Sequence, residues 1–223
     1  MHRFFIFCCF LQVSSSYVIF NGTVRAQIIN LHNTFRSNLA FGKQVWIGKS
    51  KNYPNASRMF WLKWDDALAT SAGKRAASKV IQNNEGKLTA AIPAGVGENH
   101  YGVEFASVGT NLPPTSMFQK AWQDWNSYWM IFGLPSLTYT PSTDPINDHD
   151  KESSYQLFTG NTYAVGCAYQ IVTPNLGGYV VVCHYRNKGL NANTPVYVVG
   201  TTCSQCPAAT STCNAVKGLC VMN

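Results

Sequence analysis

Apolar side chains recur at helical spacing near the start of the chain. From Thr23 to Ala40 they follow steps of four, three, four and four residues. The members of this repeat are Val24, Ile28, Leu31, Phe35 and Leu39. Such a one-sided repeat predicts an amphipathic helix, which Gly42 can terminate.

Two further helices are predicted downstream. Asp65 and Asp66 suit an N-cap and an acidic first turn. The narrow stripe that follows them consists of Leu68, Ala72, Ala76 and Val80. A third helix is predicted near Ser116 to Trp129, with Phe118, Ala121, Trp122, Trp125 and Trp129 on one side. Tryptophans at this spacing are typical of a hydrophobic core.

β-branched and aromatic residues predict a hairpin. Residues 162–172 and 177–186 flank a turn-prone stretch, and Cys167 and Cys183 could staple the two strands together. Between Leu134 and Ser154, Pro, Ser, Thr and Asp predominate, which predicts a long loop.

The first sixteen residues have the features of a secretory signal peptide. Arg3 gives a cationic tip, residues 4–13 are apolar except for Gln12, and Ser14 and Ser16 suit a signal peptidase. The alternative is a buried strand or a short core helix. We expect cleavage after Ser16 and a secreted, extracellular protein with no membrane span.

The cysteines left after cleavage all lie in the last third of the chain: Cys167, Cys183, Cys203, Cys206, Cys213 and Cys220. In an exported chain an even number indicates disulfides, whereas in a cytosolic protein the tail spacing would suggest zinc. Helical and strand periods fade after Lys188. We therefore expect a main domain at 17–190 and a cysteine-rich extension at 191–223. Asn21 and Asn55 begin glycosylation sequons.

The formal net charge of +7 favours acidic partners only in a general way. No basic run or nucleic-acid motif is present in the sequence, so a nucleic-acid partner is not expected. The sequence also lacks the serine-hydrolase elbow, the His-Glu-x-x-His zinc pair and the phosphate-binding loop.

The histidines are the remaining candidates for chemistry. We expect His32 to fix the first helix to the sheet and His184 to be an ordinary strand residue. Glu98 and His100 would share one face of a strand, because residues two apart do. A metal site rebuilt from Glu98 with either His100 or His149 is the sharper alternative to a solvated role.

Several short motifs occur in a characteristic order. They are His32-Asn33-x-x-Arg36, Trp64-Asp65-x-x-Leu68-Ala69, Gly97-Glu98-Asn99, Val165-Gly166-Cys167 and the stretch GGYVVVCHY, ahead of the cysteine-rich tail. In this order they resemble the CAP superfamily of cysteine-rich secretory proteins, antigen 5 venom allergens and plant pathogenesis-related proteins. The tail most resembles the venom-allergen-like, or activation-associated secreted, proteins of parasitic nematodes.

The resemblance covers about Tyr17 to Cys220 and implies an α+β fold. This fold is a three-layer α-β-α sandwich with a small disulfide-rich, hinge-like C-terminal extension. The resemblance also implies three disulfides, Cys167 with Cys183, Cys203 with Cys213 and Cys206 with Cys220.

In the family, two histidines and two glutamates line a central cleft and hold zinc in some members. Glu98 matches one glutamate, Trp125 takes the place of the other, and Ser153 takes the place of one histidine. The second histidine has no counterpart. One carboxylate gives zinc too few ligands, so we expect a degenerate site without a catalytic residue, a metal or a cofactor.

These observations favour a secreted, non-enzymatic binding protein that acts as a host-interaction or immunomodulatory effector of a parasitic nematode. We expect an unknown host protein or lipid as its partner, and a monomer or weak homodimer. The alternative is an extracellular sterol or fatty-acid carrier. Its groove would be lined by Trp129, Ile131, Phe132, Leu134, Leu137 and Tyr139. A metal-assisted hydrolase or protease is the least favoured class.

Overall fold

The structure is a computed structural model that describes residues 16–82, 85–104, 112–141, 145–172 and 177–223. Nearly all of the predicted signal peptide, and most of the turn between the hairpin strands, lie outside these ranges. Among the described helices, none is long and apolar enough to cross a membrane.

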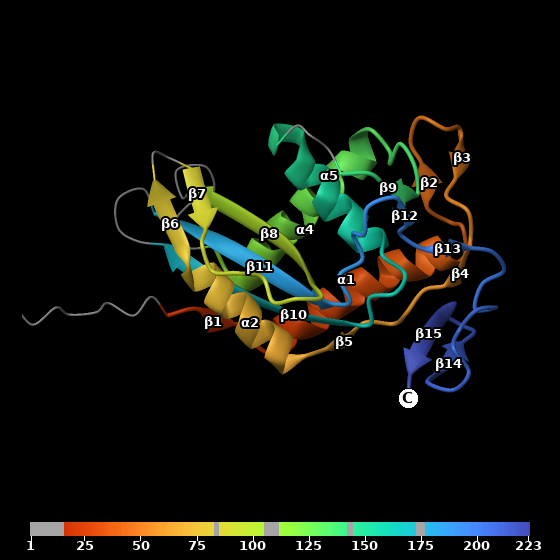
Figure 1. Ribbon diagram of the computed structural model, residues 1–223. Helices are drawn as coiled ribbons and strands as arrows, with labels where there is room; N and C mark the ends of the chain where they lie inside the picture. The colour runs from red at the N-terminus through yellow and green to blue at the C-terminus, as the bar shows by residue number, and fades with distance from the viewer. Residues whose placement is uncertain (1–15, 83–84, 105–111, 142–144, 173–176) are drawn as a thin grey trace, which may run out of the picture.

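A five-stranded sheet forms the middle of the molecule, with strand order β1-β10-β11-β8 and with β5 beside β10 (Figure 1). Its strands are β1 Val18–Ile19, β5 Lys63–Trp64, β8 Val96–Glu104, β10 Ala164–Val172 and β11 Gly178–Arg186. The strands β10 and β11 form the predicted hairpin, in which Cys167 lies opposite Cys183 and is bonded to it.

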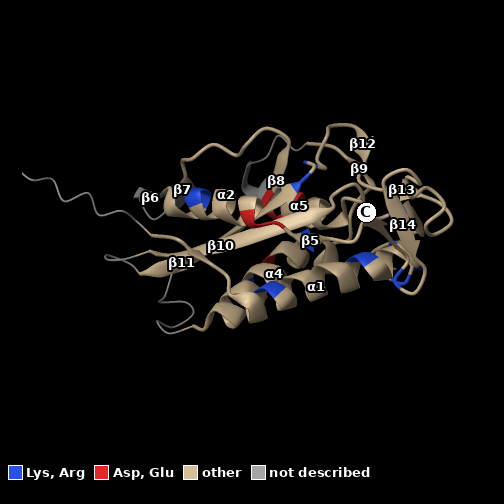
Figure 2. Ribbon diagram, turned by 90° about the horizontal axis from the view of Figure 1, so that it is seen from below, with Lys and Arg blue, Asp and Glu red and all other residues tan. Residues whose placement is uncertain are grey.

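Helices cover both faces of this sheet, as Figure 2 shows in a view along its layers. They are α1 Gly22–Ala40, α2 Asp66–Ala77, α4 Pro114–Ile131 and α5 Pro145–Phe158. Successive strand residues point to opposite faces. Thus Val180 and Val182 pack with α2, whereas Tyr179 and Val181 join the larger core with α1, α4 and α5. The predicted α+β class and three-layer sandwich are confirmed.

The caps explain where the first two helices begin. The side chain of Asn21 accepts a hydrogen bond from the backbone N–H of Val24, and Asp65 does the same for Leu68. All three predicted helices are present with nearly the expected bounds. Val80 is not on α2, because the helix ends at Ala77 and β6 follows.

The prediction of one long loop from Leu134 to Ser154 is wrong, because α5 begins at Pro145. Proline suits the first turn of a helix, where its missing N–H is not needed. The C-terminal half of α5 is buried against α4, and the Oγ of Ser154 donates to the carbonyl of Trp125. Tertiary packing therefore stabilises a helix whose polar composition suggests a loop.

Short paired strands complete the fold. They are β2 Val45–Trp46, β3 Lys51–Asn52, β4 Ala56–Arg58, β6 Lys79–Gln82, β7 Glu85–Leu88, β9 Thr138–Tyr139, β12 Thr194–Pro195, β13 Val198–Val199, β14 Ser211–Asn214 and β15 Leu219–Met222. Because β12 pairs with β9 and β13 pairs with β4, the start of the predicted extension is attached to the main domain. The division at residue 190 stays a prediction.

The tail is held by two disulfides, Cys203–Cys213 and Cys206–Cys220. These pairs, and Cys167–Cys183, are the ones that the resemblance implies. The tail is also tied to the main domain, since the N–H of Cys220 donates to the carbonyl of Met59 and its carbonyl accepts from the N–H of Trp61.

Two buried polar residues of α1 fix this helix to the rest of the molecule. His32 contacts the carbonyl of Ile28 at 2.8 Å and the hydroxyl of Tyr185 on β11 at 3.0 Å, which confirms its predicted structural role. Burial lowers the pKa of His32 to about 4. The guanidinium of Arg36 donates to four backbone carbonyls, those of Phe60, Thr159, Gly160 and Thr162.

Candidate functional site

A charged cluster surrounds Glu98 on β8. The strand register places Glu98 directly opposite His184 of β11. The Nε2 of His184 lies 3.0 Å from Oε2 of Glu98. On the neighbouring helix α2, Arg75 donates to both carboxylate oxygens, from Nε at 2.9 Å and from Nη2 at 3.2 Å. Three elements therefore converge on one carboxylate.

His100 completes the cluster from the same face of β8. Its Nδ1 lies 3.3 Å from Oε1 of Glu98, and its side chain is 35% exposed. The expectation that the two residues share a strand face is therefore confirmed. His149 lies on α5, but its side chain lies outside the described part of the structure.

The prediction that His184 is an ordinary strand residue is wrong. Its side chain is fully buried, and both ring nitrogens have partners, Glu98 on one side and the Oγ of Ser71 at 2.9 Å on the other. Ser71 and Arg75 are four residues apart on α2 and therefore share a helix face. This face lies over the β8–β11 pair and brings both side chains to the same site.

The electrostatics of Glu98 follow from this environment. Its side chain is only 6% exposed. Burial alone would raise the pKa of Glu98, but hydrogen bonds from His100, His184 and Arg75 outweigh it and hold the pKa well below its usual range. Glu98 is therefore an anion at any physiological pH. It is a poor proton acceptor, because a general base needs a pKa near the working pH.

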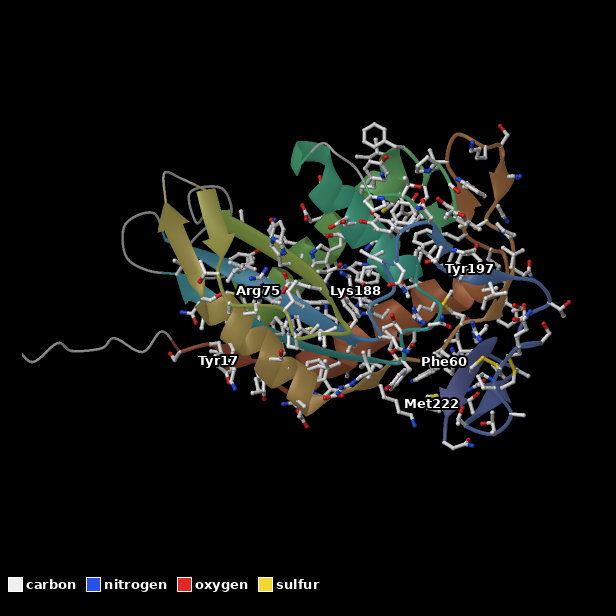
Figure 3. The ribbon with its side chains drawn as sticks, viewed as in Figure 1. Tyr17, Phe60, Arg75, Lys188, Tyr197 and Met222 are labelled. Carbon is white, nitrogen blue, oxygen red and sulfur yellow. A yellow bond between two sulfur atoms is a disulfide. The ribbon has the colours of Figure 1, made fainter. Side chains whose placement is uncertain are left out.

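A cavity of about 430 Å³ opens beside this cluster. Figure 3 labels two residues that line it, Arg75 from α2 and Lys188 from the segment after β11. Residues 92–97 contribute another wall, and Glu152 and Ser153 of α5 contribute a third. The cavity is thus lined by charged side chains of both signs together with apolar side chains such as Ile92 and Leu190.

The structure brings together only part of the predicted degenerate site. Ser153 lines the cavity with Glu98, and its carbonyl accepts from Nδ2 of Asn99 at 3.2 Å. Trp125 is fully buried in the core, and its Nε1 donates to the carbonyl of His100 at 2.9 Å. It supports β8 from beneath and offers no ionisable group.

The cluster does not fit a zinc ion. Zinc needs three or four donor atoms with free lone pairs, but both oxygens of Glu98 already accept hydrogen bonds from the cationic Arg75. Within the described ranges, no three His, Cys, Asp or Glu side chains are grouped so that they could hold a metal ion. The guanidinium instead supplies the positive charge beside the carboxylate.

The residues predicted to line a lipid groove are divided between the core and the surface. Trp129, Leu134 and Tyr139 are buried in the core, and Tyr139 also lines the central cavity. Leu137 is only partly buried against the same core. The side chains of Ile131 and Phe132 point outward, with exposed fractions of 63% and 67%.

Both sequon asparagines are exposed. Asn21 is the N-cap of α1, and its cap bond uses the side-chain oxygen, which leaves the nitrogen for a glycan. The Nδ2 of Asn55 donates to Oγ1 of Thr202 at 3.3 Å. Glycosylation of Asn21 and Asn55 stays a prediction.

Comparison with known proteins gives relatives from venoms and from a parasite. Venom allergen 5 of Tityus serrulatus is 29% identical over 188 residues, which cover 83% of this chain and 42% of that protein. Ancylostoma secreted protein of Ancylostoma caninum is 27% identical over 199 residues, which cover 89% and 44%. The solved structure of Na-ASP-1 matches with a TM-score of 0.74 and 26% identity, over 94% of this chain and 49% of that one.

These similarities confirm the predicted resemblance to the CAP superfamily. No family model matches the sequence. The chain spans less than half the length of the two curated relatives named above. Those relatives carry the names of secreted and venom proteins, which agrees with the disulfides and with an extracellular protein.

Sequence reasoning missed the role of two residues in the cluster, Arg75 and His184. The sequence did contain a signal for Arg75. Ser71 and Arg75 are four residues apart, beside the stripe of small residues, so they share the helix face that packs against the sheet. His184 could be found only after the register of β11 against β8 was known.

Proposed function

We propose that this protein is a secreted effector that binds a host protein and catalyses no reaction. The state of Glu98 is the observation that carries the proposal. A carboxylate held by Arg75 with its pKa well below the usual range cannot take a proton from a substrate or water near neutral pH. The other two predicted site positions, Trp125 and Ser153, supply no second acid or base.

The central cavity is the surface that fits such binding best. Lys188 and Glu152 line it together with His100, whose side chain is partly exposed. Charges of both signs around one opening favour recognition of a specific polar or charged partner, because unlike charges must each be matched. The sequence resemblance to nematode secreted proteins supports a host protein as that partner.

A pull-down from host extracellular fluid tests the proposal with the chain expressed from Tyr17. The variants are Lys188→Glu, which changes the cavity wall, and Lys217→Glu, a matched charge reversal on the exposed tail. We expect one protein to be enriched by the wild type and by Lys217→Glu, and much less by Lys188→Glu.

Three results would count against this function. If no protein is enriched, the chain does not bind a protein of that fluid. Equal enrichment by the wild type and both variants would exclude the cavity as the interface. Hydrolysis of a peptide or ester substrate that disappears in Glu98→Gln would contradict the non-enzymatic part.

A further inference from the structure

An exposed apolar surface is formed by residues that do not line the central cavity, and the proposed function does not use it. It consists of Val45, Ile47, Met130, Ile131 and Phe132, whose exposed fractions are 52%, 38%, 58%, 63% and 67%. We call these five residues the apolar tip. Single exposed apolar residues are common on proteins, but a contiguous group marks an interaction site.

Backbone contacts show that the two segments of the apolar tip are neighbours. The β2–β3 hairpin carries Val45 and Ile47, and the end of α4 carries the other three residues. At Gly133 a Cβ atom would lie only 2.2 Å from the carbonyl oxygen of Ile47, so only glycine permits this approach. Figure 1 shows the β2–β3 hairpin at the outer edge of the molecule.

The base of the tip is rigid. The indole N–H of Trp46 donates to the carbonyl of Leu134, and the Trp46 ring stacks on Tyr53 with centroids 4.6 Å apart. The hydroxyl of Tyr53 in turn accepts from the N–H of Leu134. Strand alternation turns Trp46 inward and leaves Val45 and Ile47 outward. The exposed side chains are therefore presented by a fixed frame.

Cations flank the tip. The Nζ of Lys51 lies 5.7 Å and that of Lys49 6.0 Å from the centroid of the Trp46 ring. The sequence contains no Asp or Glu from Phe41 to Trp64 or from Trp125 to Ser142. Protruding aliphatic and aromatic side chains beside lysines are what a membrane interface with anionic lipids accepts, because the apolar groups enter the acyl boundary and the lysines reach the headgroups.

We propose that the apolar tip docks this protein on anionic lipid bilayers. The side chains of Ile131 and Phe132 insert into the bilayer, and Lys49 and Lys51 contact the negatively charged headgroups. The protein itself carries no lipid molecule in this mode of binding. This surface binding differs from a sterol or fatty-acid groove, because the occupant is the membrane face. It is also separate from the central cavity, so either proposal can fail alone.

Vesicle co-sedimentation of the chain expressed from Tyr17 tests the proposal. The vesicles are phosphatidylcholine alone or phosphatidylcholine mixed with phosphatidylserine. We expect binding to the mixed vesicles that weakens as salt is added. The double variant Ile131→Ser/Phe132→Ser should bind the mixed vesicles at least about tenfold more weakly, because apolar area that would enter the bilayer is lost. Val216→Ser is the matched control, because Val216 is 84% exposed on the tail.

The lysines are tested separately with Lys49→Gln/Lys51→Gln. Each lysine near an anionic surface changes affinity about fivefold, so we expect a loss of roughly 30-fold for the pair. Absence of binding by the wild type would overturn the proposal, as would equal binding to both vesicle types. A dimer in sedimentation velocity that dissociates in the Ile131→Ser/Phe132→Ser variant, without vesicle binding, would assign the tip to self-association instead.

Discussion

Replacing Arg75 by alanine tests the charged cluster most directly. The Arg75 and Glu98 side chains are only 14% and 6% exposed. The replacement removes two hydrogen bonds to Glu98 and also the donor to the carbonyls of Leu88 and Ala90. Losing one partner of a buried ion pair costs about 3 to 5 kcal/mol. We expect the free energy of unfolding at pH 7 to fall by about this amount.

A second variant, Glu98→Gln, separates the charge from the packing. It keeps the side-chain shape but weakens charge-assisted hydrogen bonds, which contribute about 1.5 to 3 kcal/mol. In Arg75→Ala/Glu98→Gln no buried carboxylate is left uncompensated. The double variant should therefore be about 2 kcal/mol more stable than the sum of the two single losses predicts, in a double-mutant cycle.

Acid provides an independent check on the same residue. The pKa of Glu98 is lowered in the folded state, whereas an unfolded glutamate titrates near about 4.3. The stabilisation is therefore complete above about pH 5 and is lost as the pH falls through the unfolded value towards the folded one. Glu98→Gln should lack this component. Urea unfolding followed by circular dichroism at pH 7, 5 and 3 measures both effects. Additive single losses, or an unchanged acid dependence in Glu98→Gln, would refute the reasoning.

Four further predictions concern the frame. The pKa of His32 is lowered to about 4 in the folded state, whereas histidine in the unfolded chain binds its proton near pH ~6.5. The free energy of unfolding should therefore fall by about 3 kcal/mol between pH 7 and pH 4. The same pH dependence in His32→Gln would contradict this. Arg36→Lys should cost about 3 kcal/mol or more in urea unfolding, since one ammonium cannot replace a guanidinium on four carbonyls. Both Asn21→Gln and Asn21→Asp should lose a glycan by mass spectrometry, but Asn21→Gln alone should also lose about 1 kcal/mol of capping energy. Replacing Cys206 and Cys220 by serine should lower the melting temperature by removing about 2 to 4 kcal/mol, whereas removing the other tail disulfide should mainly increase proteolysis within the tail.

The elements that the sequence predicted well are those with strong local periodicity. The stripe from Val24 to Leu39 repeats at helical spacing, and the two strands of the hairpin are rich in β-branched and aromatic residues around Cys167 and Cys183. The helix α5 was missed because its polar first turns resemble a loop and its burial depends on α4. Local pattern carries no information about a neighbour that is distant in the chain.

The candidate site divides in the same way. Glu98 and His100 lie two residues apart, so their shared strand face follows from the sequence. The contact of Glu98 with Arg75 depends on how α2 packs on the sheet, and its contact with His184 depends on strand register. The missing ligands in the sequence predicted a degenerate zinc site. Only the packing of the folded chain reveals that Arg75 donates hydrogen bonds to both oxygens of the Glu98 carboxylate.

The hydrogen bonds between the tail and the main domain set the timing of folding during synthesis. Backbone groups of Met59 and Trp61 find their partners only on Cys220, close to the last residue of the sequence. At about 5 to 20 residues per second, a ribosome needs roughly 8 to 30 s to travel between these two points. Throughout that interval the carbonyl of Met59 and the N–H of Trp61 lack these two hydrogen bonds. The two groups must therefore be protected from wrong partners until Cys220 has been synthesised.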